Sequence, residues 1–195
     1  MRLVLASASP RRADLLRAAG FAFDAVPADI DERVLPGERP EDHVRRLALG
    51  KALTVAHLYP HRAVVAADTV VVIEELILGK PETDEAAAAM LRRLSGRSHE
   101  VLTGLCVCHA SRVRQAVERS TVRFATIEDD EILSYVASGE PRDKAGAYAI
   151  QGVASRFVMA VEGSYSNVVG LPVATLYGLL RELGLTGGAP SGSVV

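Results

Sequence analysis

The chain has 195 residues, of which 49% are hydrophobic and 24% are charged, so it has enough apolar material for a folded core and is not intrinsically disordered. Its 22 basic and 24 acidic residues give a net charge of −2, which argues against a broadly basic surface for nucleic-acid binding. It has no tryptophan and only 5% aromatic residues, too few for platforms on which single strands stack. This length suits one domain, or two small lobes that share a cleft.

Short apolar runs and helix signals alternate along the first part of the chain. Ser9 and Pro10 have the character of an N-cap and a first helical residue, which predicts a helix from residue 10 to the glycine at 20. Residues 63–73 are apolar at nearly every position, as in a central strand that is covered on both faces. The other elements expected here are strands over 3–6 and 21–26 and a helix over 40–58.

The second part continues the alternation of strands and helices. Thr83 is the expected cap of an alanine-rich helix over 84–94, and two long strands over 101–110 and 113–127 are expected to form a hairpin. The remaining elements are a helix over 129–138, a strand over 157–161, a helix over 172–183 and a disordered tail over 186–195. This interleaved order predicts an α/β fold with a mixed sheet.

The cysteines and the apolar runs bear on the cellular compartment. Cys106 and Cys108 would point to the same face of a strand, a poor geometry for a disulfide, and we expect reduced, buried thiols. The N-terminal apolar run, residues 3–5, is shorter than the ~7–15 residues of an export signal. The longest uncharged run, 163–180, is interrupted by asparagine, glycine and proline and does not suit a membrane span. We expect a cytoplasmic protein without a membrane or nucleic-acid partner.

The segment from Ser7 to Arg12 carries a chemical signal of its own. The first turn of a helix has free N–H groups and a positive dipole end, which favour acidic side chains. Arg11 and Arg12 run against this preference. A bound phosphate would remove the conflict, because the N–H groups, the hydroxyls of Ser7 and Ser9 and both guanidinium groups would converge on its oxygens. The alternative is a solvated arginine pair on an ordinary helix.

Asp68 lies inside the apolar strand expected over 63–73. A carboxylate buried without a partner is costly, so Asp68 requires a cation. Lys51, on an apolar helix face, and Lys80, in a rigid Gly-Lys-Pro turn, are candidates, as is a metal ion. Desolvated, partnered carboxylates are typical of catalytic bases and metal ligands. The alternatives are that Asp68 caps a bend and that the lysines reach out to solvent.

Other residues and motifs carry less information. Gln151 has an amide that can both donate and accept, which suits the edge of a pyrimidine base, although a surface glutamine in a turn is the commoner case. His99 is expected to make a structural hydrogen bond. The motifs of P-loop kinases, dinucleotide-dependent oxidoreductases, serine hydrolases and zinc proteases are absent from the sequence, which removes most support for those functions.

Seven sequence blocks, in their order, resemble those of the Maf family, the septum-formation-inhibitor-like nucleoside triphosphate pyrophosphatases. The blocks are LASASPRR (5–12), DE (31–32), ADT (67–69), LGKP (78–81), HEVLTG (99–104), DKAGAY with IQG (143–148 and 150–152) and NVVGLP (167–172). Together they are far more specific than any one of them. The resemblance implies a single Maf-like domain over 1–185, with a mixed, elongated central β-sheet flanked by helices and two lobes around a nucleotide cleft, as in Maf and ITPase-like proteins.

The resemblance also implies an activity, the hydrolysis of the α–β phosphoanhydride of a nucleoside triphosphate with Mg²⁺ or Mn²⁺. It makes Asp68 the proton acceptor that activates water and makes Glu32 and Asp68 the metal ligands. Whether Asp68 is base, ligand or both stays open, and a homodimer is a further family-level expectation. The residues that would bind substrate are Ser7, Ser9, Arg11, Arg12, Lys51, Thr69, Lys80 and Gln151.

The resemblance implies specificity positions at Arg11, Thr69 and Gln151, and Arg11 and Gln151 favour the branch of the family that acts on dTTP and UTP. The branch that acts on 7-methyl-GTP carries tryptophan at the position of Arg11, and this chain has no tryptophan. We therefore expect a house-cleaning dTTP/UTP pyrophosphatase, which would also suit modified pyrimidine nucleotides. One departure is Ala149, where many relatives have glycine. The alternatives are hydrolysis of 7-methyl-GTP or another noncanonical purine nucleotide, and a nucleotide-binding regulator of cell division.

Overall fold

The computed structural model describes residues 1–186, so all but the first residue of the expected tail lies outside the described residues. The strands are β1 (Arg2–Leu5), β2 (Ala22–Ala25), β3 (Val64–Ile73), β4 (Leu76–Leu78), β5 (Ser98–His109), β6 (Arg112–Phe124) and β7 (Val158–Glu162). The helices are α1 (Pro10–Ala18), α2 (Pro40–Ala56), α3 (Asp84–Leu94), α4 (Asp129–Ala137), α5 (Tyr165–Val169) and α6 (Val173–Glu182), with 3₁₀ turns η1 (Ala145–Ala147) and η2 (Val153–Phe157).

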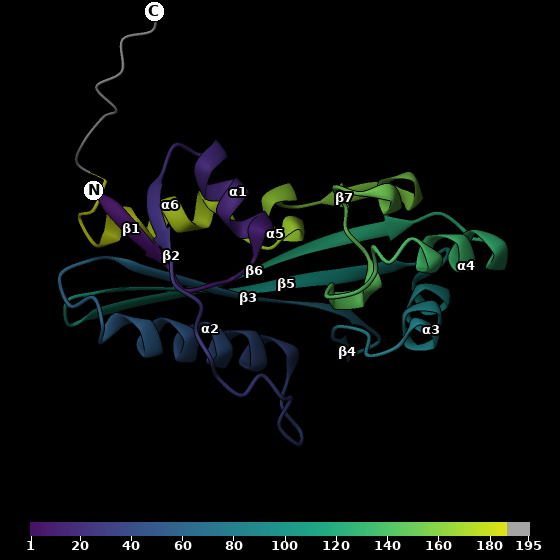
Figure 1. The fold of residues 1–195 in the computed structure, drawn as a ribbon, viewed down its shortest axis with the longest axis horizontal. Helices are drawn as coiled ribbons and strands as arrows, with labels where there is room; N and C mark the ends of the chain where they lie inside the picture. The colour runs from purple at the N-terminus through teal and green to yellow at the C-terminus, as the bar shows by residue number, and fades with distance from the viewer. Residues whose placement is uncertain (187–195) are drawn as a thin grey trace, which may run out of the picture.

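Three long strands, β3, β5 and β6, run through the length of the molecule (Figure 1). The described strands form one sheet in the order β2-β1-β3-β5-β6-β7, with β4 paired to β3. Because β1 is parallel to β2 and β3 while the other pairs are antiparallel, the sheet is mixed, which confirms the expected fold class. The expected hairpin of two long strands is β5 and β6.

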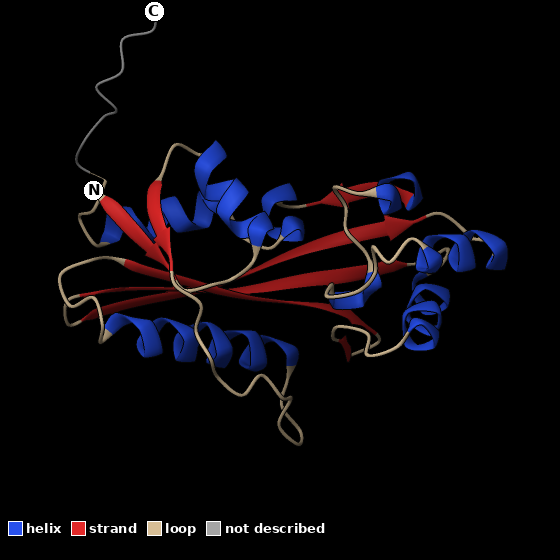
Figure 2. Ribbon diagram, viewed as in Figure 1, coloured by secondary structure: helices blue, strands red, loops and turns tan. Residues whose placement is uncertain are grey.

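Helices cover both faces of one half of the sheet and gather at the end of the other half (Figure 2). In the first half, α1 and α6 lie on one face over a core that includes Leu16 and Leu176, and α2 lies on the other face over a core that includes Val55. In the second half, α3 and α4 enclose a separate core around Phe124 and Tyr135. The chain thus forms two lobes that share the long central strands.

The expected elements are present with ends shifted by up to three residues, and four short elements are additional. Strand β4, helix α5 and the turns η1 and η2 were not expected from the sequence. Each spans only three to five residues, too short to show a hydrophobic period. Three of them, β4, α5 and η1, contribute residues to the pocket described below.

A gap in strand pairing determines where the pocket lies. On one edge of β3, β1 pairs only with Val64 and Val65, and β4 pairs only from Val71 onward. The other edge of β3 is paired with β5 along its length. Residues 66–70 of β3 therefore have no strand beside them on the first edge, and this stretch contains Asp68.

Helix α2 approaches the sheet very closely where it crosses β5. A Cβ atom at Gly104 would lie 2.1 Å from the backbone oxygen of Val44, so only glycine permits this approach. Gly104 pairs in register with Asp68 on β3. The crossing point therefore fixes α2 beside the part of β3 that has no strand on its other edge.

The two cysteines are reduced and buried in the sheet, as expected. Cys106 and Cys108 are free, with their sulfur atoms 3.9 Å apart on the α2 face of the sheet.

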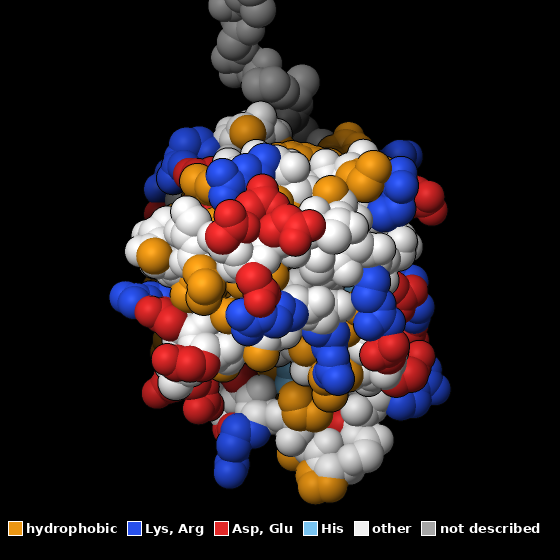
Figure 3. Space-filling view, turned by 90° about the vertical axis from the view of Figure 1, so that its right-hand side faces the viewer, with side chains coloured by type: hydrophobic (Ala, Val, Ile, Leu, Met, Phe, Trp, Pro, Cys, Tyr) orange, Lys and Arg blue, Asp and Glu red, His pale blue; other side chains and the backbone are white. Residues whose placement is uncertain are grey.

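Within residues 1–186, no helix combines the length and apolarity that a membrane crossing needs. Figure 3 shows the end of the molecule that carries α3 and α4, where acidic and basic side chains are interspersed rather than gathered by sign.

Candidate active site

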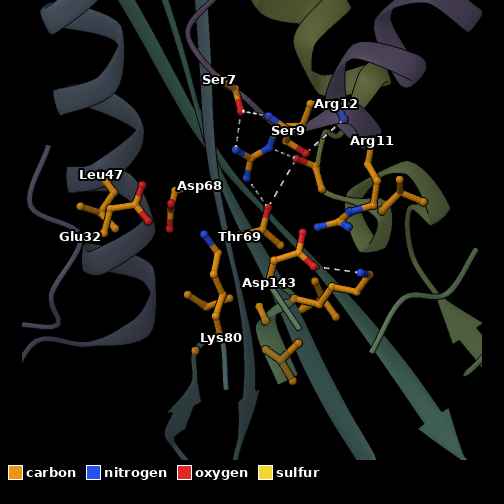
Figure 4. A pocket seen from close by; sticks show the side chains of 18 of the residues that line it. Ser7, Ser9, Arg11, Arg12, Glu32, Leu47, Asp68, Thr69, Lys80 and Asp143 are labelled. Carbon is orange, nitrogen blue, oxygen red and sulfur yellow. Dashed lines mark hydrogen bonds and ion pairs between the residues drawn. The ribbon is translucent and has the colours of Figure 1, made fainter. Parts of the chain in front are cut away.

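A pocket of about 500 Å³ opens at the unpaired stretch of β3, between the two lobes. It brings together every candidate site residue from the sequence, although these come from six separate segments. Figure 4 labels most of them. The residues are Ser7, Ser9, Arg11, Arg12, Glu32, Lys51, Asp68, Thr69, Lys80 and Gln151. A site for one extended, charged ligand requires such residues to surround a single space, as they do here.

The N-terminus of α1 forms one wall of the pocket. Ser9 is the N-cap, as expected, and its hydroxyl accepts a hydrogen bond from the backbone N–H of Arg12 at 3.5 Å. Ser7 Oγ accepts a hydrogen bond from the backbone N–H of Ser9 at 3.2 Å. The first turn contains no acidic residue, so its positive end is not neutralised by the helix itself. This wall is therefore suited to an anion.

Arg12 connects three segments around the pocket. Its Nε donates to the carbonyl of Gly170 at 2.8 Å, Nη1 donates to Ser7 Oγ at 3.2 Å and Nη2 donates to Thr69 Oγ1 at 3.1 Å. Burial lowers the pKa of Arg12, and the charges of nearby carboxylates only partly offset this effect. Three of its N–H donors are thus engaged within the protein, and about two of the five remain for a ligand.

Lys51 lies between two carboxylates on the opposite wall. Its Nζ is 2.7 Å from Asp68 Oδ1 and 2.6 Å from Glu32 Oε1. Burial raises the pKa of Glu32, but the hydrogen bond and charge of Lys51 outweigh it, so the net pKa is lowered. Asp68 is only 7% exposed and Lys51 only 6%, so the cation expected to compensate Asp68 is Lys51. The second oxygen of Asp68, Oδ2, makes no hydrogen bond to any described residue.

The carboxylates of Glu32 and Asp68 are a donor set that fits a hard divalent cation. Mg²⁺ is usually held by one or two carboxylates together with substrate phosphates and water. Both side chains face the pocket, and Lys51 brings their oxygens to the same nitrogen. Within residues 1–186 no group of three or more His, Cys, Asp or Glu side chains forms a complete metal site. These residues thus suit a cation that arrives with an anionic ligand.

The second lobe contributes Lys80 and the segment that follows α4. Lys80, directly after β4, extends into the pocket (Figure 4). Gln151 lies in the turn between η1 and η2, at the pocket and exposed to solvent. Asp143 and Lys144 also line the pocket, and Lys144 Nζ donates to Asp143 Oδ1 at 3.0 Å. Sequence reasoning singled out only Gln151 in this segment, although the acid–base dipeptide was itself a visible signal.

Two histidines illustrate what the sequence could and could not reveal. His99 lies outside the pocket and is bonded to the hydroxyl of Tyr148 at 2.8 Å, in keeping with the structural role expected for it. His43 on α2 does line the pocket. Sequence reasoning missed it because its partner, Glu38, lies in a loop and neither residue belongs to a recognisable motif.

Comparison with known proteins shows the family of the chain and a similar fold. Residues 2–183 match the Maf family, described as "Maf-like protein". The chain is 51% identical over 187 residues to a "dTTP/UTP pyrophosphatase" of Citrifermentans bemidjiense, covering 95% of this chain and 97% of the relative. It is 56% identical over 187 residues to a protein of the same name from Anaeromyxobacter dehalogenans, covering 94% of each chain.

Among solved structures, the Staphylococcus aureus Ham1 protein has a similar fold. The TM-score is 0.54 at 15% sequence identity, over 94% of this chain and 100% of the other. At this identity the similarity concerns the fold alone. The match over residues 2–183 and the relatives about half identical to it show that the chain belongs to the Maf family.

Proposed function

We propose that this chain is a nucleoside triphosphate pyrophosphatase that hydrolyses dTTP and UTP to the monophosphate and pyrophosphate in a house-cleaning role. The observation that carries the proposal is the pocket in which Asp68 and Lys51 stand opposite the arginine-bearing start of α1. The names of relatives that are 51% and 56% identical support the same substrates. A cytoplasmic location, where such substrates occur, is part of the proposal, and the homodimer stays a prediction.

Positioning and charge neutralisation would supply most of the catalysis, because the substrate carries several negative charges. Arg11, the free donors of Arg12 and the N–H groups of α1 would bind phosphate oxygens from one wall. Lys80 would reach the same oxygens from the second lobe. Lys51 would stay paired with Asp68 and Glu32 and so orient both carboxylates.

The chemical step would be attack of water on the α-phosphorus. A bond forms between the water oxygen and that phosphorus, and the bond to the α–β bridging oxygen breaks. The electron pair leaves with pyrophosphate. Asp68 is suited to accept the water proton, since Lys51 holds Oδ1 at 2.7 Å while Oδ2 has no hydrogen bond from a described residue. A carboxylate positioned in this way is a general base.

A divalent cation, Mg²⁺ or Mn²⁺, is part of the proposal. Glu32 and Asp68 are the residues that would hold it together with substrate oxygens. Such a cation neutralises phosphate charge and makes a bound water more acidic. Asp68 would then serve as ligand, as base, or as both in turn. Removal of divalent cations with a chelator is expected to abolish turnover and leave the fold intact.

We assign recognition of the nucleotide base to Gln151. Thr69 and Arg11 are further specificity positions. An amide matches the alternating donor and acceptor groups of a pyrimidine edge. A pyrophosphatase for 7-methyl-GTP is the second candidate, and Arg11 is the observation against it, because that branch of the family has tryptophan there.

The test is a pyrophosphate-release assay with dTTP, UTP, CTP, GTP and 7-methyl-GTP in the presence of Mg²⁺. The proposal predicts turnover of dTTP and UTP well above the other three. Preferential hydrolysis of 7-methyl-GTP would replace it with the second candidate. Binding of nucleotides with no turnover of any of them would favour a nucleotide-binding regulator.

A further inference from the structure

Glu38, His43 and Arg46 form a hydrogen-bonded cluster that takes no part in the chemistry described above, and of the three His43 lines the pocket. Glu38 belongs to the loop before α2, and the other two residues are on the helix. His43 lines the pocket and is 3% exposed. It lies one turn from Leu47 and two turns from Lys51, and all three line the pocket, so the ligand-facing side of α2 ends at this histidine.

Glu38 determines which nitrogen of His43 carries the proton. Glu38 Oε2 is 2.9 Å from His43 Nδ1 and accepts a hydrogen bond from Arg46 Nη2 at 2.8 Å. The hydrogen bond from Arg46 lowers the pKa of Glu38 to about 2, so the carboxylate is ionised and can only accept. Nδ1 must therefore donate to Glu38. The longer contact of 3.3 Å between Nδ1 and Arg46 Nη2 is then not a hydrogen bond.

In the neutral ring with Nδ1 protonated, the other ring nitrogen, Nε2, is a hydrogen-bond acceptor. It makes no hydrogen bond with any residue in the range 1–186, and it is not among the fully buried atoms without a partner in that range. His43 lines the pocket and its Nε2 is not fully buried, which supports access to this nitrogen from the space that a ligand would fill. A histidine whose tautomer is fixed by a carboxylate presents such a nitrogen reliably.

The surroundings of His43 determine which part of a ligand it could meet. The pocket also carries the apolar side chains of Val34, Leu47, Val70 and Ile77. His43 and Lys51 are separated along α2 by about 12 Å, at about 1.5 Å per residue. A neutral acceptor nitrogen does not bind phosphate oxygens, which are themselves acceptors. It binds an O–H or N–H donor, and in a pyrimidine nucleotide such donors belong to the sugar and the base.

We propose that His43 contacts the nucleoside half of the substrate, accepting at Nε2 a hydrogen bond from a sugar hydroxyl or from the imide N–H of the base, and that Glu38 acts as its positioning residue. This inference rests on the function proposed above. The donors that dTTP and UTP share are the 3′-hydroxyl and the N3–H group, so one of these two is the partner.

The main test compares His43→Phe with the wild type on UTP and measures inhibition by inorganic tripolyphosphate, which has no nucleoside. Loss of one hydrogen bond is expected to raise KM for UTP about 10-fold with a smaller change in kcat. The inhibition constant of tripolyphosphate should not change. His57→Phe, at the exposed C-terminal end of the same helix, is the matched control and should behave as wild type. Equal effects on UTP and tripolyphosphate, or no effect on UTP, would overturn the proposal.

Analogues identify the donor on the substrate. If the 3′-hydroxyl is the partner, 3′-deoxy-UTP should bind wild type and His43→Phe equally well. If the base is the partner, N3-methyl-UTP should do so instead. If both analogues show the full difference between the two proteins that UTP shows, neither donor meets His43 and the proposal is wrong.

If His43→Phe does not fold, a measurement on the wild type can still test the proposed contact. Nitrogen-15 NMR of the imidazole rings should show a His43 with a protonated Nδ1 and an unprotonated Nε2, and Nε2 should shift when α,β-methylene-UTP binds. In Glu38→Gln the preference between the two tautomers should weaken. A protonated Nε2, or no shift on binding, would refute the assignment. If wild type binds and hydrolyses no pyrimidine nucleotide, the proposed function fails first.

Discussion

Asp68 is held through only one of its carboxylate oxygens, and this determines what its substitution should do. Asp68→Asn would remove the proposed base but leave Lys51 with its second partner, Glu32, at 2.6 Å. No buried charge is therefore left alone, and we expect the fold to persist while kcat falls by about 10²–10⁴-fold, the usual contribution of a general base. Pyrophosphate release measures the first effect and a thermal melt the second.

The matched control for Asp68→Asn is Asp14→Asn, on the exposed surface of α1 with its own arginine partner. It should leave turnover unchanged. Near-normal turnover of Asp68→Asn would remove this residue from the mechanism. A large drop in the melting temperature of Asp68→Asn would mean that the carboxylate serves the fold as well.

Gln151 is exposed in a turn, so its substitution should act on ligand selection rather than on stability. For Gln151→Ala we expect kcat/KM for UTP and dTTP to fall about 10-fold, the value of one or two hydrogen bonds, with little change for CTP and GTP. The measurement is the same nucleotide panel. If all nucleotides lose equally, Gln151 does not read the base.

The sequence revealed the chemistry of single residues and offered Lys51 as a candidate partner of Asp68, but it did not reveal other contacts between distant segments. Arg11, Arg12 and Asp68 were visible because each is unusual for its local element. Glu38 and His43 were not, since a bond between a loop and a helix depends on how the loop folds back. The engagement of Arg12 with Gly170, 158 residues away in sequence, could not be seen either.

Among the elements, the crossing of α2 over β5 fixes one wall of the pocket. Gly104→Ala would place a Cβ atom 2.1 Å from the Val44 oxygen, so α2 must move away from the sheet. We expect a loss of about 1–3 kcal/mol in the free energy of unfolding, as for other overpacked sites, together with reduced turnover as Lys51 shifts from Asp68. Urea unfolding and pyrophosphate release measure the two effects.

The matched control for Gly104→Ala is Gly178→Ala on α6. A Cβ atom at Gly178 meets nothing within 4 Å, so this helical substitution should stabilise the protein by up to about 1 kcal/mol. Equal stability of Gly104→Ala and the wild type would show that α2 is not held against β5 as described.

The junction between β5 and η1 should make stability depend on pH. Burial lowers the pKa of His99 from 6.5 to about 4, and the neutral ring bonds Tyr148 at 2.8 Å. The unfolded chain therefore binds this proton at a higher pH than the folded chain. The stability from neutral His99 is complete above about pH 6.5 and is lost as the pH falls toward 4.

Between pH 7 and pH 5, protonation linked to His99 is expected to lower the free energy of unfolding by about 2 kcal/mol. Urea unfolding of wild type and of His99→Gln at both pH values measures this change. The variant should be less stable than wild type at pH 7, but its free energy of unfolding should fall less between pH 7 and pH 5. His57→Gln, at an exposed position, should keep the wild-type pH dependence. The same pH dependence in His99→Gln would show that other groups produce the effect.

Helices whose ends carry capping residues could be predicted from the sequence. A strand whose position depends on an unusual backbone conformation could not. Helix α3 begins where Thr83 caps it, and α1 begins at Pro10. Strand β4 follows a turn in which Glu74 and Glu75 both have positive φ, 51° and 62°. Such a turn usually carries asparagine and glycine, so a pair of glutamates gives no sign of a hairpin.

For the whole molecule, the essential feature is that β1 and β4 leave the middle of β3 without a neighbour on one edge. This depends on pairing between strands that are far apart in sequence, which composition and periodicity do not encode. Residue patterns indicated an α/β fold with a mixed sheet, whereas chain length left one domain and two small lobes both open, and the family resemblance favoured two lobes around a cleft. The assembled pocket places the start of α1, Lys80 and Asp68 around one space.

The central claim is that water attacks the α-phosphorus of a pyrimidine nucleotide in this pocket. The most direct measurement is UTP hydrolysis in ¹⁸O-labelled water, with the products separated and weighed by mass spectrometry. One labelled oxygen in UMP and none in the pyrophosphate at early times is the predicted result. Label in the pyrophosphate, or formation of UDP and inorganic phosphate, would contradict the account.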